Sequence, residues 1–145
     1  MKTIKTKIII DAPLSKVWNI LMDHSSYPSW NPFLLSISGS TQVGETISVS
    51  FHQENKKPMV FKPVVLKNET NSEFRWLGHL FVKGLFDGEH YFKLESISDN
   101  QTRFIHGENF TGLMAGVILK MIGDSTLKGF NNMNKAIKIR AEKNN

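Results

Sequence analysis

Residues 3–22 read TIKTKIIIDAPLSKVWNILM and join a strand directly to a helix. The first part alternates between a face with two lysines and a face with three isoleucines: Lys5 and Lys7 against Ile4, Ile8 and Ile10. This period of two is typical of a strand with one solvated face. Pro13 suits the first turn of a helix. The apolar positions that follow have the spacing of one helical face, which predicts a short amphipathic helix: Leu14, Val17, Trp18, Leu21 and Met22.

Strand signals dominate the middle of the chain. Residues 27–33 can hold only a short second helix, because Pro32 disfavours helical geometry in the residue before it. From residue 35 the apolar period changes to two, with Gly, Asn and Asp at the breaks. Six segments follow: 35–37, 47–51, 58–67, 73–82, 85–97 and 102–110. With the N-terminal strand they predict a seven-stranded antiparallel meander.

Residues 111–141 return to a helical period. Leu113, Val117 and Met121 mark the expected inner face of the first half of this helix, and Phe130 and Ile137 continue it. We therefore expect an α+β fold in which a strongly curved seven-stranded antiparallel sheet wraps around one long C-terminal helix. Two short helices lie between the first and second strands. Such an arrangement leaves a cavity between helix and sheet, where ligands bind.

Composition limits the function classes. The 145 residues suit one domain spanning 1–145. The chain has no cysteine, which excludes disulfides, thiolate metal sites and cysteine nucleophiles. The net charge is +5, but the lysines are scattered, so we expect solvated faces and no nucleic-acid partner. No apolar stretch reaches the roughly 18 residues of a membrane span, and the apolar run before Asp11 is too short for a signal peptide, so a cytoplasmic location without membrane insertion is expected.

Four stretches carry a resemblance to a known superfamily: residues 10–18 (IDAPLSKVW), 27–33 (YPSWNPF), 85–92 (LFDGEHYF) and 102–113 (TRFIHGENFTGL). Together with the order of elements they resemble the START-like or SRPBCC superfamily, also called the polyketide cyclase/dehydrase group, and within it a bacterial subgroup. The resemblance covers essentially the whole chain and implies the helix-grip fold. The resemblance does not specify one function, because this superfamily includes lipid carriers, hormone receptors, cyclases, hydroxylase domains and chaperone cofactors.

The hairpin over residues 88–110 carries the most informative polar residues. Alternation places His90 on the apolar face of its first strand, and His106 and Glu108 on the apolar face of its second. If the turn near Asp99 has an odd number of residues, both sets face the core and His90 lies opposite Glu108; an even number puts one set outside. We favour the odd turn, because it buries more aromatic surface.

The His90–Glu108 pair has three readings. It can be a general acid and base in a cyclisation, dehydration or hydrolysis. It can contact a polar group of a ligand, or it can be a structural hydrogen-bonded pair. A mononuclear metal site with His106 as a further ligand is conceivable, but none of the histidines has the spacing of a metal motif, so we expect neither a metal nor a cofactor.

The favoured function is the binding of a hydrophobic small molecule, such as a lipid, an isoprenoid or a polyketide-like compound. An enzyme that uses His90 and Glu108 stays as an alternative, although a role without catalysis is preferred. A protein-interaction module of the chaperone-cofactor type is a third possibility, and the chain is expected to be a monomer or a homodimer. The residues expected to contact the ligand are Trp30, Phe33, Trp76, His90, Phe92, His106, Glu108, Phe110, Leu113, Val117 and Met121.

Overall fold

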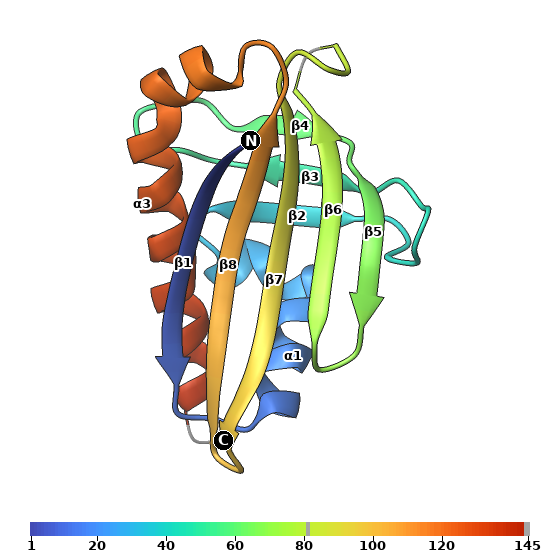
Figure 1. Cartoon of the computed structure of the whole chain (residues 1–145). Helices are drawn as coiled ribbons and strands as arrows, with labels where there is room; N and C mark the ends of the chain where they lie inside the picture. The colour runs from blue at the N-terminus through green and yellow to red at the C-terminus, as the bar shows by residue number, and fades with distance from the viewer. Residues whose placement is uncertain (81, 144–145) are drawn as a thin grey trace.

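The computed structural model describes residues 1–80 and 82–143, which form two antiparallel sheets and a set of helices (Figure 1). The larger sheet has the strand order β1 (Lys2–Ile10), β8 (Gln101–Thr111), β7 (Asp87–Ser98), β6 (Glu73–His79) and β5 (Val64–Glu69). The smaller sheet has the order β2 (Leu34–Ser38), β3 (Ser48–Phe51) and β4 (Met59–Phe61). The helices are α1 (Leu14–Met22), the one-turn α2 (Tyr27–Trp30) after a 3-10 turn at His24–Ser26, and α3 (Ala115–Glu142).

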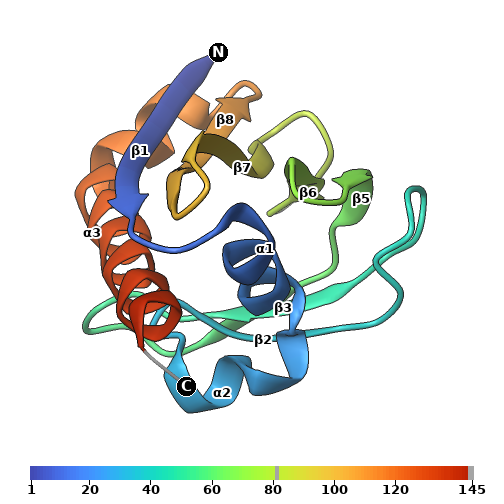
Figure 2. The same cartoon turned by 90° about the horizontal axis from the view of Figure 1, so that it is seen from below.

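The two sheets and α3 surround the interior of the molecule. The smaller sheet lies behind the larger one, and its strands cross the long strands at a steep angle (Figure 1). Viewed from below, α3 closes one side of the space between the sheets, and α1 lies across the lower end of that space (Figure 2). This is the expected α+β arrangement, with one long C-terminal helix against a curved antiparallel sheet and two short helices between the first and second strands.

The prediction of seven strands in a single sheet is wrong. The segment predicted as one strand over 58–67 divides at Pro63 into β4, which pairs with β3, and β5, which pairs with β6. Proline has no backbone N–H to continue a ladder, so the chain passes there from one sheet to the other. Hydrogen bonds still connect the two sheets at this edge, since the Ile47 N–H donates to the Pro63 carbonyl at 3.0 Å.

The β7–β8 hairpin has the register that the aromatic pattern favoured. His90 pairs with Glu108, and Phe92 pairs with His106. A register shift between Ser96 and Ser98 inserts one extra residue before the turn. This β-bulge makes the number of residues in the connection odd, so the apolar side chains of both strands lie on the inner face.

The long C-terminal helix is confirmed, but its inner face is not the predicted one. Leu113, Val117 and Met121 are 90%, 56% and 79% exposed and lie on the outside of the helix region. Ala115 and Ile118 pack inward instead, against the Phe86 and Phe110 cluster. Residues 113–122 are apolar at almost every position, so the period of their large side chains gives no unique face.

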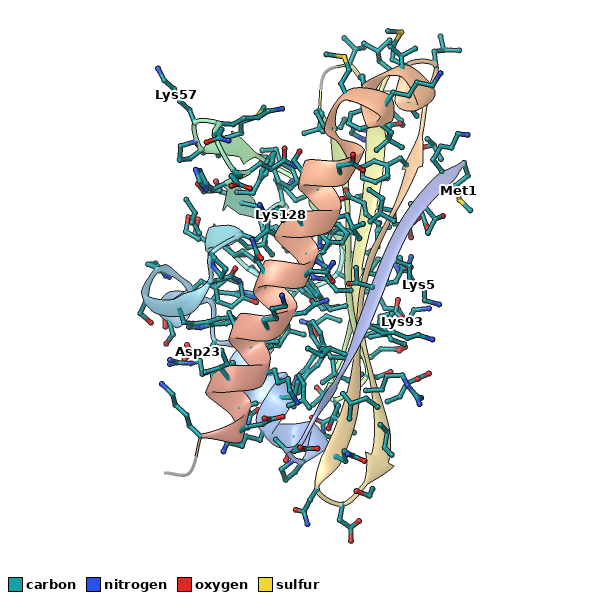
Figure 3. All side chains as sticks on the ribbon, turned by 90° about the vertical axis from the view of Figure 1, so that its left-hand side faces the viewer. Met1, Lys5, Asp23, Lys57, Lys93 and Lys128 are labelled. Atoms are coloured by element: carbon teal, nitrogen blue, oxygen red, sulfur yellow. The ribbon has the colours of Figure 1, made fainter. Side chains whose placement is uncertain are left out.

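Many side chains point into the space between α3 and the larger sheet, whereas Lys5 and Lys93 lie on the outer side of that sheet (Figure 3). The main core joins α1, both sheets and the second half of α3, with Trp76, Phe92 and Phe130 fully buried at its centre. Among the described residues, no helix is both long enough and apolar enough to cross a membrane.

Candidate functional site

A cavity of about 220 Å³ lies between the two sheets and the first half of α3. The hairpin strands β6, β7 and β8 form its floor, and the smaller sheet and α3 face them across the space. Its wall is mainly apolar and rich in aromatic rings: Phe33, Phe51, Phe61, Trp76, Phe86 and Phe110. Exposed Lys56 and Met59 also line it, which places its outer end beside the β3–β4 connection.

The structure brings five of the predicted ligand contacts to this wall: Phe33, Trp76, His90, Glu108 and Phe110. Their strands alternate so that every second side chain faces inward, as the sequence pattern indicated.

The other predicted contacts lie elsewhere. Phe92 and His106 are fully buried behind the wall and do not reach its surface. Trp30 packs at the edge of the main core, with the guanidinium of Arg140 6.0 Å from its ring centre. On α3, the side chains that line the cavity are Ile118, Ile122 and Thr126, in place of the predicted Leu113, Val117 and Met121.

Sequence reasoning missed several members of the wall. Phe51 and Phe61 come from the smaller sheet. No local sequence pattern predicts that this sheet packs over the larger one. Gln53 lies two residues after Phe51, and its Nε2 donates to Thr126 Oγ1 at 2.8 Å. The alternation of Ile47, Val49 and Phe51 was the one signal that pointed inward from this region.

Two polar residues on the cavity wall begin a chain of buried hydrogen bonds. His90 Nδ1 lies 3.2 Å from Glu108 Oε1, and His90 Nε2 lies 2.8 Å from His106 Nε2. His106 Nδ1 then meets Asn134 Oδ1 of α3 at 3.0 Å. Asn134 Nδ2 donates to Thr6 Oγ1 of β1 at 2.8 Å, and Thr6 Oγ1 donates to the His106 carbonyl at 2.8 Å.

Aromatic rings hold both imidazoles of this chain. The Trp76 ring stacks on His90 with centroids 4.8 Å apart and planes 17° apart. The Phe130 ring stacks on His106 at 4.1 Å and 13°.

Burial has a strong effect on His106. It lies at 0% exposure, and desolvation, followed by the neighbouring His90, holds the pKa of His106 well below its ordinary value of 6.5. His106 is therefore neutral at pH 7. In the part of the chain that the structure describes, no group of three or more acidic, histidine or cysteine side chains is arranged to hold a metal ion.

One family of known proteins matches nearly the whole chain. The family model for polyketide cyclases/dehydrases and lipid transport matches residues 1–137. A sequence comparison with curated proteins gave no match.

Solved structures of similar fold cover nearly the whole chain. The Zhui aromatase/cyclase of a Streptomyces species has a TM-score of 0.78 at 11% identity, over 97% of this chain and 93% of that chain. A START superfamily protein from Mycobacterium smegmatis has a TM-score of 0.72 at 16% identity, over 97% of each chain. A hypothetical protein from Helicobacter pylori has a TM-score of 0.77 at 15% identity, over 97% of this chain and 88% of that chain. At these identities the likeness establishes the fold alone.

Proposed function

Because the chain belongs to the polyketide cyclase/dehydrase and lipid transport family, we propose that it binds a hydrophobic small molecule in the cavity between the two sheets and α3. The single observation that carries this proposal is the cavity itself, with its aromatic wall and its few converging polar groups. Sites for small molecules usually combine these two properties.

The size of the cavity limits the ligand. Its volume of about 220 Å³ lies below the range of roughly 300–1,000 Å³ that is usual for drug-sized ligands. A compact isoprenoid or a small polyketide-like ring system suits this space better than a whole lipid with two acyl chains. A longer molecule fits only if part of it extends past Lys56 and Met59 at the outer end.

Native mass spectrometry of the protein purified from its own host, followed by organic extraction, tests the proposal. A discrete co-purifying apolar molecule is expected. Ile118→Trp fills the cavity from α3 and is expected to abolish retention of that molecule. Val117→Trp is the matched control, because Val117 is the adjacent residue on the outside of the same helix. Equal retention by both variants would contradict binding in this cavity.

A second candidate function rests on one distance. His90 Nδ1 and Glu108 Oε1 are 3.2 Å apart on the cavity wall, and a general acid–base pair needs such a contact within reach of the bound molecule. The reaction class is then cyclisation or dehydration of a carbonyl compound. Conversion of the extracted molecule by the wild-type protein, lost in Glu108→Gln, would favour this candidate over binding alone.

A further inference from the structure

The hydrogen-bond chain behind the cavity has only one possible direction, which its far end determines. The His106 carbonyl oxygen can only accept, so the Thr6 hydroxyl uses its one proton there, at 2.8 Å. Thr6 Oγ1 must then accept from Asn134, which fixes the orientation of the Asn134 amide. The Asn134 oxygen therefore faces His106 and accepts from His106 Nδ1–H, at 3.0 Å.

This direction passes on to the cavity wall. A neutral His106 with its proton on Nδ1 has a lone pair on Nε2, so His90 Nε2–H donates to it at 2.8 Å. His90 Nδ1 and Glu108 Oε1 are then left with one proton between them, carried either by the imidazole or by the carboxyl group. Without that proton, a lone pair would face a carboxylate oxygen.

The proton count makes the whole cluster neutral. Either Glu108 is a carboxylate beside a charged His90, or both groups are uncharged. Moving the positive charge from His90 to His106 would leave the net charge of the cluster unchanged. That form is disfavoured, because His106 is fully buried. Apart from these groups, Lys56 at the outer end is the remaining charged side chain among the described residues that line the cavity.

The second carboxyl oxygen of Glu108, Oε2, is an acceptor in every one of these forms, because the shared proton lies on the Oε1 side. Oε2 makes no hydrogen bond with any residue that the structure describes, although Glu108 lies on the apolar wall. It packs against Gly88, where a Cβ atom would overlap it. Oε2 is not fully buried, so a molecule in the cavity can reach it, and there it offers an acceptor on an otherwise apolar wall.

We propose that Glu108 Oε2 receives a hydrogen bond from the ligand, so that the cavity selects a neutral, compact, apolar molecule that carries a hydroxyl or another uncharged hydrogen-bond donor. This inference rests on the proposed function, since it specifies the ligand of the same cavity. Thr6 and Asn134 are positioning residues that act through the two histidines. A charged ligand group next to Glu108 is disfavoured, because the cluster that it meets carries no net charge to offset its burial.

Three two-ring probes test the inference by calorimetry at neutral pH: naphthalene, 2-methoxynaphthalene and 2-naphthol. Naphthalene offers no polar group, the methoxy compound offers only an acceptor, and 2-naphthol offers a donor. We expect 2-naphthol to bind about tenfold tighter than either of the others, as one satisfied hydrogen bond to an acidic group predicts. Glu108→Leu removes the acceptor and is expected to remove this preference.

Glu108→Gln is the matched variant. Its amide N–H can donate to a neutral His90 and leave its oxygen in the position of Oε2, so the preference for 2-naphthol is expected to persist. Glu108→Gln also tests the proposed hydrogen bond to the ligand if Glu108→Leu fails to fold. Loss of the preference in Glu108→Gln would overturn the assigned direction.

The outcomes separate the two proposals. Equal affinity of the wild-type protein for all three probes would overturn the hydroxyl preference and leave apolar binding intact. Failure of the wild-type protein to bind any of the three would contradict the apolar binding site, and the inference with it.

Discussion

The Nε2 atoms of His90 and His106 lie 2.8 Å apart, one residue at the cavity wall and the other fully buried behind it. Two ring nitrogens at this distance share a single proton, so one imidazole donates and the other accepts. The side chains beyond His106 decide which does so, because Asn134 Oδ1 faces the other nitrogen of His106. The protonation of a group in the cavity therefore depends on a contact between α3 and β1.

This relationship predicts the tautomers of both histidines. We expect His106 to be neutral with its proton on Nδ1, and His90 to carry the proton that lies between the two Nε2 atoms. Nitrogen-15 NMR of imidazole-labelled protein distinguishes the two ring nitrogens directly. Asn134→Leu removes the acceptor of His106 and is expected to destabilise the protein by about 1–3 kcal/mol, since it leaves a buried donor unpaired. A proton on Nε2 of His106 in the wild-type protein would contradict the chain direction.

A second prediction concerns acid stability. His24 packs against Tyr27 and Phe74, and burial lowers the pKa of His24 from 6.5 to about 4. Between these two pH values the unfolded chain binds a proton that the folded chain does not, so stability is lost as the pH falls from about 6.5 to about 4. The same sign holds for His106, whose pKa is also lowered by burial.

The measurement is urea unfolding of the wild-type protein and of His24→Phe at a series of pH values. Each pH unit within the window contributes at most about 1.4 kcal/mol per histidine. Between pH 6.5 and pH 4 the free energy of unfolding of His24→Phe is expected to fall less than that of the wild-type protein. The difference between the two losses is roughly 3 kcal/mol. Comparing both proteins at each pH cancels the effects of the carboxylates. Parallel curves would show that His24 titrates normally in the folded protein.

A third prediction concerns the space that Gly88 leaves for Glu108. A side chain at residue 88 would overlap the Glu108 carboxylate, so Gly88→Ala is expected to displace the carboxylate from His90. The contact between Glu108 and His90 would lengthen, and the signal of their shared proton would change in the same NMR spectrum. Gly116→Ala is the control, because nothing lies within 4 Å of a Cβ there. An unchanged His90 spectrum in Gly88→Ala would show that the added methyl group is accommodated without moving the carboxylate away from His90.

Much of the larger sheet was predictable from the sequence, because the phenylalanines of its hairpin lie at alternate positions along each strand. Only one of the two registers considered for the hairpin buries Phe92, Phe104 and Phe110 together, and the structure has that register. The passage of the chain between sheets at Pro63 gave no such signal. Proline cannot donate a backbone hydrogen bond to a neighbouring strand, but its presence does not predict which strand the following residues pair with.

The candidate site was predictable only where it lies within one hairpin. His90 and Glu108 are cross-strand neighbours, so period-two reasoning could bring them together. Thr6 and Asn134 are 128 residues apart, and their contact follows from the docking of α3 on β1, which no local pattern encodes. The inner face of α3 was predicted wrongly at the start of the helix, because residues 113–122 are apolar at almost every position.

The glycines of α3 provide the last prediction, because three of them stand in one helix with different surroundings. Gly116 and Gly123 face open space, with nothing within 4 Å of an added Cβ, whereas a Cβ on Gly129 would lie 2.6 Å from Phe33 Cδ1. Alanine in an open helical position removes unfolded-state freedom and raises helix propensity. We expect Gly116→Ala and Gly123→Ala each to stabilise the protein by about 0.5–1 kcal/mol.

Gly129→Ala is expected to have the opposite effect. Phe33 is buried between α3 and the cavity, with its ring 5.5 Å from Phe130 and 6.5 Å from His90, so it has little room to retreat. Overpacking of this kind costs about 1–3 kcal/mol. Thermal unfolding of the three variants measures the contrast, and displacement of Phe33 into the cavity would also weaken naphthalene binding in Gly129→Ala alone. If Gly129→Ala were as stable as the other two variants, α3 would have to be free to move away from β2, and the cavity would not have a fixed volume.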